Sequence, residues 1–216
     1  MRYLIALLLP GLLVLAGLQA FSKTEGNAST RSDWEDDSCG FVQNIYSKKL
    51  SWQGNLPIKL YIHESVPSNM RLPIQRAIDT WEKTSGKKLF EIVATDKRGG
   101  KDLSNFKDGT NTIYWFNKGE WKGDKDDQAK TVISWIGSQI NQSNILINSD
   151  TMKFYSEMAT GLNQVDLESV ILHELGHVLG LKHNDKRPGI MATYLKENSE
   201  RRNILTADMD SIRCVY

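Results

Sequence analysis

"HELGHVLGLKH", residues 173–183, decides how this chain folds, and it contains three of the four histidines in the sequence. His173 and His177 are four residues apart, so on a helix their side chains project from one face, one turn apart. Their imidazole rings can therefore approach a single ion. Gly180 is the residue best able to end that helix with a left-handed backbone conformation. The chain then turns, and three residues later His183 can return to the same ion.

The residues upstream of His173 predict where this helix begins. Asp166 is a good N-cap residue, and Val165 before it can pack on Val170 as a hydrophobic staple. The other sides of the helix carry apolar residues: Leu172, Leu175, Val178 and Leu179. The helix should therefore be buried almost all round. Imidazoles that face inward on such a helix need partners, because unpaired buried polar groups are costly.

Three imidazoles at this spacing favour a zinc site. Neutral His side chains suit zinc, and three protein ligands leave a fourth position open for water, which is the catalytic arrangement. Glu174 would lie beside that position, where it could take a proton from the activated water and deliver it to a leaving amine. Singly, a buried His is usually a hydrogen-bonded core residue and a helical Glu is usually solvated. Together they form a known metalloprotease signature, which predicts His173, His177 and His183 as ligands and Glu174 as general base.

The sequence resembles a known family at two points. Residues 173–183 match the HExxHxxGxxH motif of metzincin metalloproteases. Met191 follows eight residues beyond His183, in "RPGIMATY" (187–194), and this spacing looks like the Met-turn of the matrixin family. The resemblance implies that Met191 lies beneath the metal as a packing base and does not ligate it.

The same resemblance implies a fold. It indicates an α+β, zincin-like (metzincin) domain with a twisted mixed five-stranded sheet and about three helices, of which the active-site helix carries HExxH. The substrate cleft of such a domain has the antiparallel edge strand of the sheet as its upper rim. Here that strand would be residues 131–136, "TVISWI".

The chain also departs from the matrixin pattern. No propeptide with an inhibitory cysteine fits between Ala20 and Cys39. Only His63 remains for a second, structural zinc, so such a site cannot be assembled. Two residues separate Met191 from Tyr194, which leaves the shape of the primed-side specificity pocket open. These departures are similar to those of compact secreted matrixin-like proteases of bacteria.

The N-terminal residues differ in kind from the rest. Residues 1–20 have one positive charge, a short apolar run and a small-residue end, which predict a secretory signal peptide cleaved near Ala20. An uncleaved N-terminal anchor is the alternative. Residues 21–38 are polar and aperiodic, so we expect a flexible segment. Residues 39–216 would then form the catalytic domain, secreted to the extracellular space or the periplasm.

Hydrophobic periodicity predicts the remaining elements. Residues 56–64 alternate like a half-buried strand, and residues 74–81 have the spacing of an amphipathic helix that Gly86 ends. Short apolar runs predict further strands at 89–94, 112–116, 131–136 and 144–148. A strand, a helix, several strands and a final helix are typical of an α+β domain.

The charge balance excludes two classes of partner. The chain has 27 basic and 26 acidic residues and a net charge of +1, so we expect no binding to nucleic acid and none to membranes after signal cleavage. We expect a monomer. The acidic run 123–128, "GDKDDQ", could bind calcium, but it lacks the spacing of a calcium loop, which favours a solvated loop.

The two cysteines, Cys39 and Cys214, bracket nearly the whole mature chain. In an oxidising compartment such a pair indicates a disulfide. An alternative is that Cys39, which precedes Gly40, caps the zinc and holds the enzyme latent, but this would leave Cys214 as an odd thiol.

The sequence thus predicts a secreted zinc metalloendopeptidase that binds peptide or protein substrates as an extended strand along residues 131–136. Two alternatives remain. One is a catalytically weak zinc-containing binding domain, against which the presence of Glu174 argues. The other is an amidase acting on a non-protein amide such as peptidoglycan, against which the methionine at Met191 argues.

Overall fold

The computed structural model describes residues 12–16, 39–102, 105–186 and 188–216, and for residues 12–16 it describes the backbone. The expected flexible segment, residues 21–38, lies outside the described residues. So does most of the expected signal peptide, apart from residues 12–16.

Six strands of the described residues form one mixed sheet in the order β1-β5-β6-β4-β2-β3. They are β1 (Leu12–Ala16), β2 (Ile58–His63), β3 (Phe90–Lys97), β4 (Asn111–Phe116), β5 (Ala129–Ile136) and β6 (Gln139–Asn148). β2 pairs in parallel with β3 and β4, β4 pairs in parallel with β6, and β5 runs antiparallel to β6. Strands β2 to β6 make up the mixed five-stranded sheet that the sequence predicts, and this prediction is confirmed.

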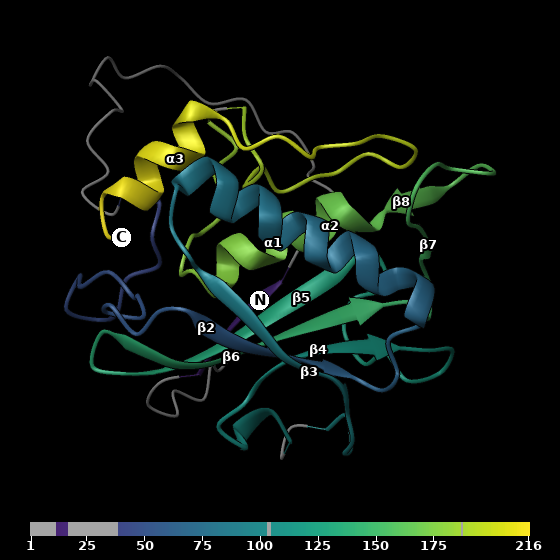
Figure 1. The fold of residues 1–216 in the computed structure, drawn as a ribbon, viewed down its shortest axis with the longest axis horizontal. Coiled ribbons are helices and arrows are strands. Elements are labelled where there is room, and N and C mark those ends of the chain that lie inside the picture. The colour runs from purple at the N-terminus through teal and green to yellow at the C-terminus, as the bar shows by residue number, and fades with distance from the viewer. Residues whose placement is uncertain (1–11, 17–38, 103–104, 187) are drawn as a thin grey trace, which may run out of the picture.

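Helices cover one face of this sheet (Figure 1). The three α-helices of the described residues are α1 (Arg71–Ser85), α2 (Leu167–Val178) and α3 (Thr206–Arg213), with short 3-10 helices η1 (Ser68–Met70) and η2 (Asn105–Lys107). A small parallel sheet of β7 (Lys153–Tyr155) and β8 (Gln164–Asp166) leads into α2. None of the described helices is long and apolar enough to cross a membrane.

The core lies between the helices and the sheet. All of α2 is buried, as its apolar pattern predicts. α1 buries Ile74, Ile78 and Trp81, the residues at helical spacing, and ends at Gly86 in a left-handed conformation with φ +68°. The Trp81 indole donates a hydrogen bond of 3.0 Å to the Leu172 carbonyl, which fixes α1 against α2.

His63, the last residue of β2, differs from its expected position. In the alternation of residues 56–64 it falls on the face opposite Ile58, Leu60 and Ile62, yet its side chain is also buried. Its Nδ1 lies 2.8 Å from the Ser65 hydroxyl and its Nε2 lies 3.1 Å from the Gly99 carbonyl. Both ring nitrogens therefore have hydrogen-bond partners, and His63 is a satisfied core histidine.

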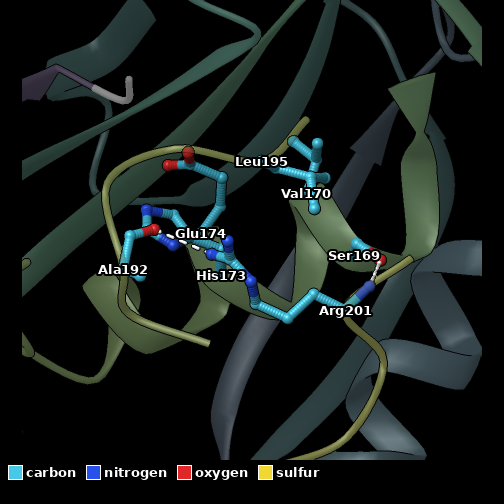
Figure 2. A pocket seen from close by; sticks show the side chains of 7 residues that line it. All are labelled: Ser169, Val170, His173, Glu174, Ala192, Leu195 and Arg201. Carbon is cyan, nitrogen blue, oxygen red and sulfur yellow. Dashed lines mark hydrogen bonds between the residues drawn. The ribbon is translucent and has the colours of Figure 1, made fainter. Parts of the chain in front are cut away.

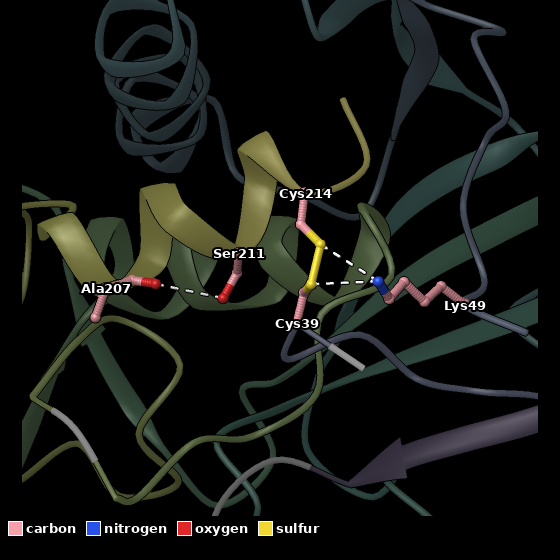
Figure 3. Close-up of a disulfide and its surroundings, with 5 residues drawn as sticks. All are labelled: Cys39, Lys49, Ala207, Ser211 and Cys214. Carbon is pink, nitrogen blue, oxygen red and sulfur yellow. Dashed lines mark hydrogen bonds between the residues drawn. A yellow bond between two sulfur atoms is a disulfide. The ribbon is translucent and has the colours of Figure 1, made fainter. Parts of the chain in front are cut away.

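A disulfide joins Cys39 to Cys214 and ties the start of the described domain to its C-terminal helix (Figure 3). The Lys49 ammonium lies 3.2 Å from the Cys39 sulfur and 3.3 Å from the Cys214 sulfur. The bond closes a loop of 175 residues, which in the chain-entropy model corresponds to roughly 5 kcal/mol of stabilisation.

The outer edge of β5 differs from its expected state. The sequence predicts residues 131–136 as an exposed edge, whereas β1 pairs antiparallel with β5 along this side. The register sets Leu12 opposite Ser134, Val14 opposite Val132 and Ala16 opposite Lys130. β5 is therefore the edge of the five-stranded sheet, and residues 12–16 cover that edge in the chain that retains them.

Candidate metal centre

The start of α2 is held by a buried carboxylate. Asp166 is the N-cap residue, and its Oδ2 accepts a hydrogen bond of 3.1 Å from the Ser169 amide and one of 2.5 Å from the Ser169 hydroxyl. Arg202 donates to both carboxylate oxygens, at 2.6 and 2.8 Å. A charged cap at a helix N-terminus satisfies free amides and suits the helix dipole. The predicted helix start is confirmed, and Arg202 is a partner that sequence reasoning missed.

The turn after α2 places His183 close to His173 and His177. Gly180 has φ +101°, a left-handed conformation that favours glycine. A Cβ at this position would lie 2.4 Å from the Leu50 carbonyl oxygen, so the backbone packing also excludes a side chain. The chain then turns sharply enough for His183 to reach the face of α2 that carries His173 and His177.

The three imidazoles converge through one nitrogen each. His183 Nε2 lies 3.2 Å from His173 Nε2 and 3.1 Å from His177 Nε2. The opposite nitrogens contact backbone carbonyls: His173 Nδ1 lies 2.6 Å from the Ile190 oxygen and His177 Nδ1 lies 2.7 Å from the Leu181 oxygen. A carbonyl oxygen only accepts, so each Nδ1 carries the proton.

This protonation pattern fits a cation. Burial lowers the pKa of His173 to about 3 and the pKa of His177 well below its usual range, so both rings are neutral. The Nε2 atom of each of these two rings therefore presents a lone pair toward His183. Burial also lowers the pKa of His183. One proton on His183 can satisfy at most one of these contacts. Two ligands on a tetrahedral zinc at about 2.0–2.1 Å are separated by about 3.3 Å, close to the distances observed here.

Glu174 lies on the sheet side of the same helical turn. The Thr131 hydroxyl of β5 donates a hydrogen bond of 2.5 Å to Glu174 Oε2, and both residues are buried. Burial raises the pKa of Glu174 to about 8, with the Thr131 hydrogen bond acting in the opposite direction and the charge of Asp127 adding to the increase. Without a metal ion, the Glu174 carboxyl therefore keeps its proton more readily than an exposed glutamate does.

Met191 packs directly against the helix that carries the histidines. A Cβ built on Gly176 would lie 2.3 Å from the Met191 sulfur, so the glycine inside the motif leaves room for this side chain. The residue before it, Ile190, supplies the carbonyl that orients His173. The segment around Met191 thus packs against α2 and orients the imidazole of His173.

A small hollow lies beside His173 and Glu174 (Figure 2). Its lining comes from the first two turns of α2 and from the chain after Met191: Ser169, Val170, His173, Glu174, Ala192, Leu195 and Arg201. Sequence reasoning did not single out Arg201.

Comparison with known proteins places the fold. A family model described as matrixin matches residues 52–216, which is more than half of the chain. The chain belongs to the matrixin family. It is 25% identical over 173 residues to metalloendoproteinase 4-MMP of Arabidopsis thaliana, which covers 76% of this matrixin and 47% of that protein. It is 41% identical over 51 residues to metalloendoproteinase 1 of Glycine max, and the match covers 24% of this matrixin and 17% of that protein. This matrixin thus matches about half or less of the length of these relatives.

Matrixins are zinc-dependent, and His173, His177 and His183 form the one group of potential metal ligands found among the residues that the structure describes.

The acidic run 123–128 is solvated only in part. Asp124 and Asp126 are exposed, whereas Asp127 is buried, and burial raises its pKa to about 6. A fully solvated loop is therefore the wrong expectation for Asp127.

Proposed function

We propose that this matrixin is a secreted zinc-dependent endopeptidase. The observation that carries the proposal is the convergence of three Nε2 atoms, of His173, His177 and His183, beside the buried carboxyl of Glu174. Zinc held by these three imidazoles would lower the pKa of a bound water from 15.7 toward about 7.

The residues of the chain would do the following work. The Ile190 and Leu181 carbonyls hold the rings of His173 and His177 in one tautomer, so both Nε2 atoms stay available as ligands. Glu174 accepts the proton of the attacking water and returns it to the leaving amine. Met191 acts as a packing base and binds no metal.

Substrate binding would use the outer edge of β5. An extended peptide can add to an exposed strand through main-chain hydrogen bonds, which gives broad sequence tolerance with a preference set by one pocket. In the structure β1 already pairs along this edge, which supports its ability to accept another strand. We infer that the mature enzyme loses β1 with the signal peptide, residues 1–20, and so frees the edge.

Secretion rests on two features. Residues 1–20 have the pattern of a signal peptide, and the Cys39–Cys214 disulfide suits an oxidising compartment. We propose that the processed protein acts as a monomer on peptide or protein substrates.

The test compares the processed wild type with E174Q on a mixed peptide library and on peptidoglycan fragments. The amide keeps the shape of Glu174 but cannot accept a proton, so we expect at least about a 100-fold loss of peptide cleavage with zinc retained. Activity of E174Q within a few-fold of wild type would remove Glu174 from its role. A wild type that binds zinc and cleaves nothing would indicate a binding domain, and cleavage of peptidoglycan alone would indicate an amidase.

A further inference from the structure

The hollow beside His173 and Glu174 is too small for a large side chain. The space open to the centre of a water molecule in it is about 10 Å³, which leaves room for a short side chain but not for a large aliphatic or aromatic one. Val170 and Leu195 form apolar walls, and the side chain of Arg201 runs across the hollow toward Ala192 (Figure 2). A substrate side chain next to the scissile bond, held at the catalytic pair, would enter this space and meet Arg201.

Arg201 is fixed there from both ends. Its backbone amide donates a hydrogen bond of 2.7 Å to the Ser169 hydroxyl on the first turn of α2. Its Nη1 donates to the Ala192 carbonyl at 2.9 Å, and its Nη2 donates to the Tyr194 carbonyl. The guanidinium therefore forms part of the pocket wall. Two of its five N–H groups donate to these carbonyls, and the others remain as possible donors to a ligand.

The charge of Arg201 has no close counter-ion. Among the described residues, no carboxylate oxygen lies within ion-pair distance of it, whereas Arg202 pairs with Asp166 and Arg213 pairs with Asp210. Burial lowers the pKa of Arg201, and more distant Asp185 and Asp208 act against this. Arginine stays charged near neutral pH, so a half-buried cation faces the hollow.

We propose that Arg201 is a specificity-determining residue that makes this pocket select short side chains, with aspartate preferred, over large aliphatic or aromatic ones. The inference rests on the proposed function and names the substrate class of the same site. The carboxylate of an aspartate can pair with the free donors of Arg201, and charge-assisted pairs of this kind are the stronger hydrogen bonds. The Glu174 carboxyl does not compete for them, because Thr131 holds its Oε2 toward β5.

The test uses peptides that differ only at the residue on one side of the scissile bond, with Asp, Ala, Leu or Phe there, and a second series varied on the other side. Processed wild type should cleave the Asp and Ala peptides of one series faster than the Leu and Phe peptides. R201Q removes the charge and keeps a polar amide, so the Asp-to-Ala ratio should fall by about tenfold or more. R201K should retain part of the preference.

R213Q is the matched control, since it removes the same charge from an exposed site on α3, where the side chain is 67% exposed. Its ratios should equal those of wild type. Wild-type preference for Leu or Phe, or an Asp-to-Ala ratio unchanged in R201Q, would overturn the proposal.

A binding measurement separates this proposal from the proposed function. Peptide hydroxamates with an Asp or a Leu side chain can be titrated into the zinc-loaded protein whether or not it hydrolyses peptides. Tighter binding of the Asp compound to wild type, lost in R201Q, supports the role of Arg201 even if no substrate is cleaved. Equal affinities in wild type, or an Asp preference that survives in R201Q, would overturn it.

Discussion

Thr131 is the residue that connects the sheet to the carboxyl of Glu174. Its hydroxyl is buried and donates to Glu174 Oε2, and it also lies 3.3 Å from the Glu174 carbonyl oxygen. A carboxyl held at one oxygen presents the other in a fixed direction, which favours proton transfer to a positioned water. Thr131 is therefore a positioning residue for the proposed general base, Glu174.

We expect T131V to lower kcat by about tenfold with KM and zinc content unchanged, because the hydrogen bond to Glu174 is lost while the shape is kept. T131S should restore most of the rate, which a purely structural role would not require. T112V is the control, since Thr112 is equally buried in β4 but its hydroxyl contacts Thr110 and Lys97. A kcat for T131V equal to that of wild type would remove Thr131 from this role.

Glu174 also links stability to pH in the metal-free protein. Burial raises its pKa from 4.5 to about 8, so the folded state keeps a proton that the unfolded state releases. The stabilisation is full below pH about 4.5 and is lost as pH rises to about 8. E174Q cannot titrate, so from pH 5 to pH 8 it should gain stability relative to wild type, by as much as about 4 kcal/mol. Urea unfolding of both metal-free proteins measures this, and parallel pH profiles would contradict it.

The chemistry of the site was predictable at the residue scale because its spacing is local. His173, His177 and Glu174 lie on one helix, and Gly180 brings back His183 within the same eleven residues. Thr131 and Arg201 were not predictable in this way. Thr131 reaches Glu174 across 43 residues of sequence and Arg201 reaches Ser169 across 32. Only the folded sheet and the returning chain bring these pairs together.

At the scale of elements, β1 and β5 decide whether the proposed substrate-binding edge is accessible. The strands β2 to β6 could be predicted from short apolar runs and the family resemblance. The pairing of residues 12–16 could not, because the same leucine-rich run satisfies both a signal peptide and a strand. An apolar segment next to an unpaired strand edge is able to occupy it.

Retention of residues 12–16 should therefore inhibit the enzyme. We expect a protein lacking residues 1–11 to cleave peptides slowly and a protein lacking residues 1–20 to cleave them faster, since β5 regains a free edge. Backbone amides on β5, such as those of Val132 and Ser134, can be followed by hydrogen exchange in both forms. Equal rates of cleavage and equal exchange along β5 would show that β1 does not block the edge.

At the scale of the whole molecule, the Cys39–Cys214 bond joins the two ends of the described domain. C39S should lower the free energy of unfolding by about 2–5 kcal/mol, because the unfolded chain regains the freedom of a long loop. Zinc content and activity at low temperature should stay near those of wild type, whereas loss of a latency ligand would raise activity at once. Thiol alkylation followed by intact-mass analysis checks the bond, and two free thiols in the non-reduced protein would contradict it.

We propose that His173, His177 and His183 together hold one zinc ion beside Glu174. Native mass spectrometry of processed wild type, E174Q and H183A counts zinc per chain directly. H183A is the suitable ligand variant, because His183 lies after α2 and is only partly buried, so the helix should persist. We predict one zinc in wild type and in E174Q and none in H183A. One zinc per chain in H183A, or none in wild type, would contradict the account.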